Sequence, residues 1–82
     1  MTYGPDTRPI HDEQVALRRR RILAGINHYK QEFGYSPTVR ELQQVAQVKS
    51  TSTVMLDLQW LRDHGMVTWT ENVHRSFRVI ED

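Results

Sequence analysis

Hydrophobic residues recur at helical spacing through the first third of the chain. Counted at about 100° per residue, the recurring positions fall within about 60° of one another, the stripe of an amphipathic helix. The stripe consists of Val15, Ile22, Ile26, Tyr29 and Phe33. Asp12 stands at the N-cap position, and Gly34 follows the stripe where glycine suits a left-handed helix end. The pattern predicts a helix over residues 13–33 and a flexible leader over residues 1–12, which contain two prolines and a glycine.

A second, shorter helix is predicted over residues 39–47. Thr38 and Glu41 have the spacing of a capping box, in which a hydroxyl and a carboxylate each satisfy an unpaired backbone N–H. Pro37 disfavours helical structure at the residue before it, so the start is sharply defined. The hydrophobic face of this helix consists of Leu42, Val45 and Ala46.

A third helix is predicted over residues 51–64, with Ser50 as its N-cap and Gly65 at its end. Its hydrophobic face consists of Val54, Leu58 and Leu61. Beyond it, hydrophobic and polar residues alternate in two short runs that are joined by residues 71–76. Such alternation predicts two half-buried strands, and therefore a β-hairpin.

The order of these elements predicts the fold. Only a short turn separates the second and third helices, as in a helix–turn–helix, and the hairpin that follows adds a wing. The fold class is therefore mainly α with a small β-hairpin, a winged helix–turn–helix over residues 13–82.

Composition adds limits to the possible functions. A chain of 82 residues holds one modest core, which leaves little room for a deep substrate pocket. It has no cysteine, so disulfides, thiolate catalysis and sulfur-ligated metals are excluded. The net charge is only +1, but residues 13–78 contain ten basic and six acidic residues, a net charge of +4. A basic body between acidic ends fits nucleic-acid binding, although it is also common elsewhere.

Several motifs resemble the DNA-binding domain of the LexA family, the repressors of the bacterial SOS response. The most specific are Gly34-Tyr35-Ser36-Pro37-Thr38-Val39-Arg40-Glu41 and Ser50-Thr51-Ser52-Thr53-Val54. The similarity runs without gaps from about residue 18 to residue 80. It implies a sequence-specific regulator of transcription that binds double-stranded DNA, most simply a repressor, encoded by a bacterium, a phage or a mobile element and located in the cytoplasm with the nucleoid.

The chain also departs from the family pattern. LexA-like proteins usually have a glycine in the turn between the second and third helices, where this chain has Gln47-Val48. The self-cleaving domain, with its Ser/Lys dyad, is not in this sequence. The chain is therefore either a piece of a longer protein or a stand-alone protein of the kind that phages carry.

The third helix supplies the candidates for base contact. With Val54 in the core, its outer face near the amino-terminal end consists of Ser52, Thr53, Met55, Leu56 and Gln59. Glutamine can pair with adenine, and apolar side chains contact the thymine methyl group. The alternative is an ordinary solvated helix face.

The candidates for contact with the DNA backbone are basic and hydroxyl residues around that helix: Arg18, Arg19, Arg40, Lys49, Ser50, Thr51, His74 and Arg75. Hydroxyls, an ammonium group and free N–H groups at a helix start suit a phosphate oxygen. Each candidate also has a purely structural alternative: a solvated helix start, a cap, a surface ion pair or a solvated turn. The wing is expected to contact the DNA backbone or the minor groove, and the chain to form a weak or DNA-dependent dimer.

Other functions are weaker interpretations. The exposed residues Met55, Leu56 and Trp60 would suit a protein-interaction module, and an architectural or recombination accessory role also fits DNA binding. The four histidines form no metal-ligating pair, and nothing places a nucleophile beside a base. We therefore expect no enzyme activity, no metal, no cofactor and no membrane partner. Trp60 and Trp69 are expected to pack in the core or the hairpin rather than to stack on bases.

Overall fold

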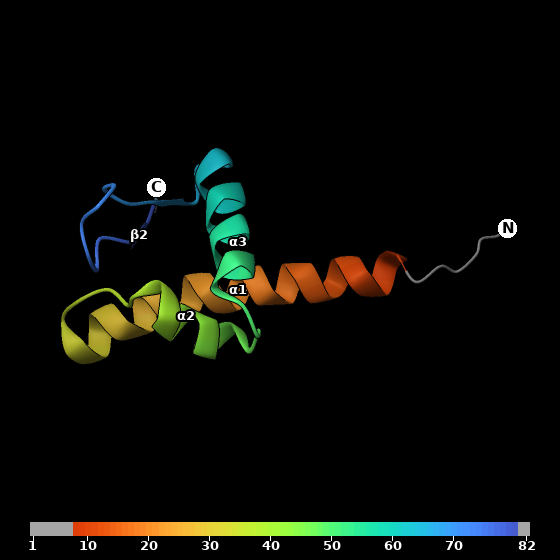
Figure 1. Cartoon of the computed structure of the whole chain (residues 1–82), viewed down its shortest axis with the longest axis horizontal. Coiled ribbons are helices and arrows are strands. Elements are labelled where there is room, and N and C mark those ends of the chain that lie inside the picture. Colours follow the sequence, from red (N-terminus) through yellow and green to blue (C-terminus); the bar gives the residue numbers. More distant parts are fainter. Residues whose placement is uncertain (1–7, 81–82) are drawn as a thin grey trace, which may run out of the picture.

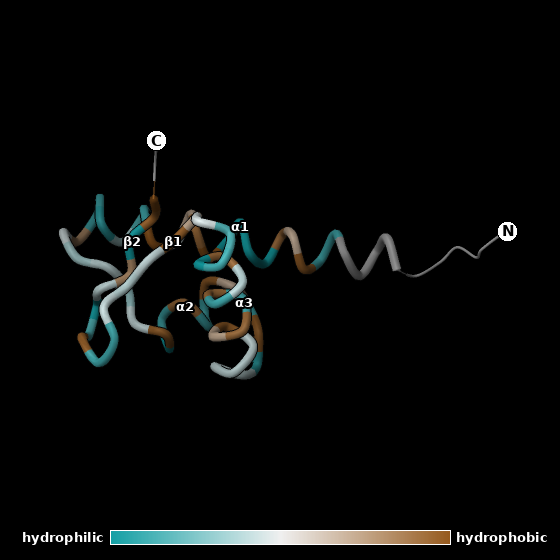
Figure 2. The backbone as a smooth tube through the Cα atoms, turned by 90° about the horizontal axis from the view of Figure 1, so that it is seen from above, coloured by the Kyte–Doolittle hydropathy of each residue, from teal (hydrophilic) through white to brown (hydrophobic). Residues whose placement is uncertain are grey.

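The computed structural model describes residues 8–80, with side chains described from residue 13 onward. Three helices precede an antiparallel hairpin: α1 (Arg8–Phe33), α2 (Val39–Ala46), α3 (Thr51–Asp63), β1 (Val67–Thr68) and β2 (Arg78–Val79). The amino-terminal turns of α1 project away from the other elements (Figure 1). Figure 2 shows the hairpin at the opposite end of the molecule from these turns. The arrangement confirms the predicted winged helix–turn–helix.

The start of α1 differs from the prediction. The helix begins at Arg8 rather than at residue 13, so Asp12 lies within the helix and is not its N-cap. Pro9 is compatible with this start because proline is tolerated in the first turn, where its missing N–H needs no partner. Residues 8–12, predicted as part of the leader, are therefore helical, and residues 1–7 lie outside the described residues.

The predicted caps of the other helices are confirmed. The backbone N–H of Glu41 donates to the Thr38 hydroxyl at 3.1 Å, and the N–H of Thr38 donates to the Glu41 carboxylate at 2.9 Å. At the start of α3, the N–H of Ser52 donates to the hydroxyl of Ser50 at 3.0 Å. Gly34 has the left-handed conformation expected of a helix end, with φ of 81°. The helices α2 and α3 each end one residue earlier than predicted.

One continuous core joins all the elements. Its buried residues are Ile22, Ile26, Leu42, Ala46, Val54, Leu58, Leu61, Val67 and Phe77. The predicted stripe of α1 is buried only in its middle, because Phe33 is exposed and stacks on Tyr35 with ring centroids 5.7 Å apart. A close approach of α1 to α2 is possible because residue 25 is glycine: a Cβ atom there would lie 2.9 Å from a methyl group of Val45.

The hairpin is short and its loop is long. Val67 pairs with Val79 and Thr68 with Arg78, while β1 packs on α3 and β2 on α1. We call the loop between the strands, residues 69–77, the wing. Trp69 and Phe77 pack edge to face at its base, with centroids 5.4 Å apart, as predicted for Trp69. The wing therefore extends from two strands of which one packs on α3 and the other on α1.

Candidate nucleic-acid interface

The outer face of α3 is the one predicted from the sequence. Ser52, Leu56 and Gln59 are exposed, and the Leu56 side chain retains 67% of its accessible surface. Thr53 is half-buried on one shoulder of this face. Because the opposite face of α3 is fixed in the core, these side chains have a defined direction into solvent. Such a surface can enter a major groove.

Met55 differs from its predicted placement. It is half-buried and packs against the core, so it is only partly available for contact with another molecule. It lines a groove of about 360 Å³ between α3 and the wing, together with Val73 and His74. Met55 therefore joins the recognition face to the wing rather than pointing freely outward.

A neighbouring groove brings several predicted contacts together. It has a volume of about 370 Å³ and lies between the wing and the starts of α2 and α3. The predicted residues that line it are Arg40, Thr51, His74 and Arg75. They come from three separate segments of the chain, so the fold brings residues that are distant in the sequence onto one surface.

The start of α3 presents Lys49, Ser50 and Thr51 to solvent. The Ser50 hydroxyl accepts the N–H of Ser52, which leaves the hydroxyl hydrogen of Ser50 available to a phosphate oxygen. The dipole of α3 also favours an anion at this end. The geometry is compatible with the predicted phosphate contact at this helix start.

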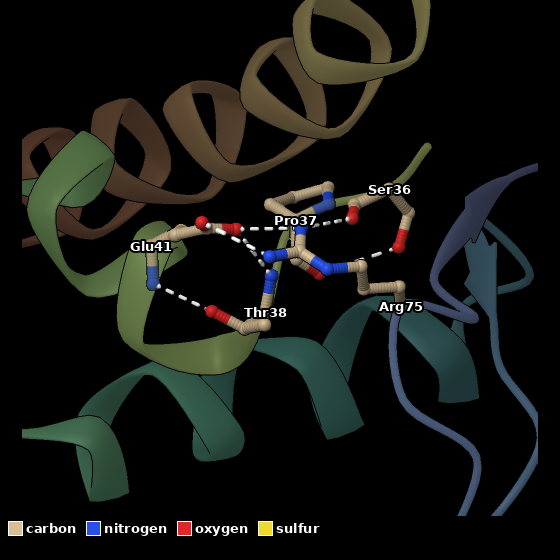
Figure 3. Close-up of polar contacts among 5 residues, drawn as sticks. All are labelled: Ser36, Pro37, Thr38, Glu41 and Arg75. Atoms are coloured by element: carbon tan, nitrogen blue, oxygen red, sulfur yellow. Dashed lines mark hydrogen bonds and ion pairs between the residues drawn. The ribbon is translucent and has the colours of Figure 1, made fainter. Parts of the chain in front are cut away.

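Arg75, in contrast, has partners within the chain (Figure 3). Its two terminal nitrogens donate to the two oxygens of Glu41 at 3.0 and 3.3 Å. One of them also donates to the carbonyl oxygen of Ser36 at 3.1 Å. The guanidinium group lies over the ring of Tyr35, 4.3 Å from its centroid. Three of the five guanidinium N–H groups of Arg75 are therefore occupied within the fold.

Glu41 therefore serves both the cap of α2 and the contact with the wing. The hydrogen bond from the Thr38 backbone, followed by that from Arg75, holds the pKa of the Glu41 carboxyl below its ordinary value. The Thr38 N–H needs one acceptor oxygen, whereas the two-point contact with Arg75 uses both oxygens of the ionised carboxylate.

Arg18 and Arg19 also have an internal partner. Arg18 donates through Nε and Nη2 to the two oxygens of Asp57, the second at 3.0 Å, and Arg19 Nε donates to Asp57 at 3.0 Å. Asp57 is only 1% exposed. Its hydrogen bond and charge raise the pKa of the Arg18 guanidinium above its ordinary value. Phosphate contact by either arginine stays a prediction that competes with this buried ion pair.

Arg40 and His74 remain available. Both side chains are exposed, and neither takes part in an ion pair within residues 13–80. Both line the groove between the wing and the starts of α2 and α3. Of the predicted backbone contacts outside the start of α3, these two agree best with the structure.

Sequence reasoning missed the importance of Asp57. With Val54 in the core, Asp57 falls on the same face as Leu58 and Leu61, so an acidic residue occupies a core-facing position. That position, opposite a helix with four consecutive arginines, was the available signal. Because a buried carboxylate requires a partner, this position indicates an ion pair, but helical spacing alone does not indicate which helix supplies the cation.

Trp60 is also placed differently from the expectation. It is 36% exposed on α3 and belongs to neither the core nor the hairpin. Its ring stacks on His64 with centroids 3.7 Å apart, and the Arg19 guanidinium lies 4.1 Å from its centroid.

Within the described part of the chain, no group of three His, Asp or Glu side chains could hold a metal ion. No described helix has the length and hydropathy needed to cross a membrane.

Comparison with known proteins agrees with this geometry. The family model described as "LexA DNA binding domain" matches residues 12–76. The chain is 34% identical over 67 residues to the LexA repressor of Roseiflexus sp. (strain RS-1), covering 82% of this chain and 31% of that protein. It is 31% identical over 78 residues to the LexA repressor of Bifidobacterium longum (strain DJO10A), covering 95% of this chain and 32% of that protein.

The chain thus spans about a third of the length of the curated relatives it matches. The family match covers most of the chain, including α2, α3, most of α1 and most of the wing. The resemblance inferred from the sequence motifs is confirmed. This chain belongs to the LexA DNA-binding domain family.

Proposed function

We propose that this chain binds double-stranded DNA at specific sequences and represses transcription by occupying a promoter. The observation that carries the proposal is the exposed outer face of α3 beside the wing, in a chain that belongs to the LexA DNA-binding domain family. The relatives are LexA repressors, and the matched region holds the whole helix–turn–helix.

Base contact is assigned to the outer face of α3. Its exposed residues Ser52, Leu56 and Gln59 enter the major groove, with Thr53 and the partly buried Met55 beside them. Leu56 offers an apolar surface to a thymine methyl group, and Gln59 a two-point hydrogen bond to adenine. The recognised site therefore includes A·T base pairs opposite Leu56 and Gln59. Ser52 and Thr53 can contact any base, so they do not specify one.

Backbone contact is assigned to residues around this helix. Arg40, Lys49, Ser50, Thr51 and His74 surround the amino-terminal end of α3 and face solvent. When these residues contact phosphates, the wing lies along the sugar–phosphate backbone or the minor groove. Direct contacts by Arg18, Arg19 and Arg75 stay predictions, because the guanidinium group of each already donates to a carboxylate within the fold.

The dimer is expected to be weak or to form only on DNA. Two copies would occupy half-sites about one helical turn apart, since a recognition helix repeats its contacts with that spacing. A palindromic site would then bind more tightly than a half-site.

The experiment that tests this function is a selection of genomic DNA fragments by the purified chain, followed by titration of selected and scrambled duplexes. Two free cations, Arg40 and Lys49, predict a log–log salt slope of about −2. The selected duplex should bind more tightly than the scrambled one, and reporter expression from that site should fall. A slope near zero, or equal binding of heparin and duplex, would sink the DNA-binding proposal.

A protein-interaction module is the second candidate. It is favoured by an apolar groove of about 410 Å³ between α1 and α3, lined by Leu23, Trp60, Leu61 and Met66 among others. The residues that α3 contributes to this groove, Trp60 and Leu61, lie in its carboxy-terminal half. Capture of a protein partner by a chain that binds no duplex would favour this candidate.

A further inference from the structure

The wing is attached to the helices by few polar contacts. The paired strands contain only two residues each, and the loop between them is nine residues long. Within the described residues, two ion pairs connect this loop to helices. Glu71 pairs with Arg62 of α3 at 3.2 Å, and Arg75 pairs with Glu41 of α2 at 3.0 Å.

The pair between Arg75 and Glu41 is the stronger restraint of the two. It is a two-point pairing, which fixes the angle between guanidinium and carboxylate as well as their distance. The carbonyl oxygen of Ser36 and the ring of Tyr35 hold the same guanidinium group from the segment before α2. By comparison, Arg62 makes one hydrogen bond to a Glu71 side chain that is mostly exposed, and its guanidinium lies 4.0 Å from the ring centroid of Trp69.

Backbone geometry points the same way. Arg75 has a positive φ of 57°, a conformation that costs free energy for a residue with a side chain. The contacts of the Arg75 side chain with α2 offset that cost. His74, the neighbouring residue, lines the groove that also contains Arg40 and Thr51.

We propose that Arg75 is a positioning residue whose ion pair with Glu41 holds the wing against the start of α2, and that the wing contacts DNA through His74 rather than through Arg75. This inference rests on the proposed function, because it concerns how the wing is oriented when the chain binds DNA. It also replaces the expected phosphate contact by Arg75, because three of the five guanidinium N–H groups already donate to Glu41 and Ser36.

The test uses a substitution that has two opposite effects on DNA affinity, one through charge and one through the position of the wing. Glu41→Gln removes a negative charge near the DNA, which by charge alone strengthens binding. Glutamine also keeps the capping box, so α2 retains its N-cap. If Arg75 acts through Glu41, this variant instead weakens binding to the selected duplex by about two- to fivefold.

Arg75→Ala should have the same effect, and the double variant should be no weaker than either single variant. The salt slope should stay that of the wild type in both, whereas Arg40→Ala should lower its magnitude by about one. The matched control is Glu32→Gln, the same charge change on an exposed α1 residue, which should bind at least as tightly as the wild type.

A second measurement needs no DNA. Amide hydrogen exchange of residues 71–76 should accelerate in Glu41→Gln and Arg75→Ala, while amides of α3 stay protected. Unchanged exchange in the wing, or tighter DNA binding by Glu41→Gln together with a salt slope reduced by about one in Arg75→Ala, would overturn the inference. A wild-type chain that binds no duplex would refute the proposed function and the wing's part in it. The exchange data would then still decide whether Arg75 restrains the wing.

Discussion

Asp57 of α3 and Arg18 of α1 form a two-point ion pair where the two helices cross. Arg19 contributes a second guanidinium to the same carboxylate. Because Asp57 is buried, it depends on these arginines for the hydrogen bonds that water would otherwise supply. The pairing fixes the rotation of α3 about its own axis. That rotation determines that Leu56, the preceding residue, faces solvent.

Asp57→Asn should lower the free energy of unfolding by about 2–3 kcal/mol, because a hydrogen bond between charged groups is lost and polar groups stay buried. Arg18 and Arg19 are about a quarter exposed and can turn toward water, which keeps the loss below that of a fully buried pair. Urea unfolding measures the change. Asp63→Asn, on an exposed position of the same helix, should change stability by no more than about 0.5 kcal/mol. Equal effects of the two variants would contradict a stabilising role for the buried pair.

Local signals in the sequence predicted most of the fold. The capping box of Thr38 and Glu41, the cap at Ser50 and the helix end at Gly34 depend on residues within a few positions of each other. Such signals act before any tertiary contact forms. The start of α1 was the exception. Aspartate is common at N-cap positions, yet Asp12 lies inside the helix.

The candidate site was predicted less completely, because its arginines have distant partners. Arg18 and Asp57 are 39 positions apart, and Arg75 and Glu41 are 34 apart. Helical spacing indicates which residues share a face, but it does not indicate which faces meet. The exposure of Ser52, Leu56 and Gln59 follows from spacing on α3 alone and was predicted correctly.

Gln47 offers a test of backbone strain. It ends α2 with φ of 61°, at the turn where LexA-like proteins usually have glycine, and its side chain accepts a hydrogen bond from Arg21 at 3.2 Å. Gln47→Gly should raise the free energy of unfolding by about 0.5–1 kcal/mol, since relief of left-handed strain exceeds the greater entropy of the unfolded chain. The melting temperature should rise by several degrees, at about 4–8 °C per kcal/mol for a domain of this size.

The matched control is Gln44→Gly, in an exposed position inside α2. Glycine there should lower stability by about 1 kcal/mol, because the backbone is helical and gains nothing from glycine. A loss of stability in Gln47→Gly similar to that of Gln44→Gly would show that the turn is not strained.

The acid sensitivity of the fold should depend on Glu41. Its pKa is lowered in the folded state, first by the Thr38 backbone hydrogen bond and then by Arg75. The folded chain therefore binds this proton less tightly than the unfolded chain, and stability falls as pH decreases from about 5 through the folded-state pKa. Glu41→Gln should flatten this part of the pH dependence, measured by urea unfolding at a series of pH values. Parallel curves for the variant and the wild type would exclude this contribution of Glu41.

Leu56 and Leu58 should separate DNA recognition from stability. Leu58 is fully buried, so Leu58→Ala should cost about 2–5 kcal/mol of folding free energy, measured by urea unfolding. Leu56→Ala should leave the fold intact and cost about 1–3 kcal/mol of binding at particular base pairs, with binding to scrambled duplex nearly unchanged. Met55→Ala should show both effects in part, because Met55 is half-buried against the core and lines the groove beside the wing. Titration of each folded variant with selected and scrambled duplexes makes the comparison. If Leu56→Ala binds the selected duplex as tightly as the wild type, the outer face of α3 does not recognise bases.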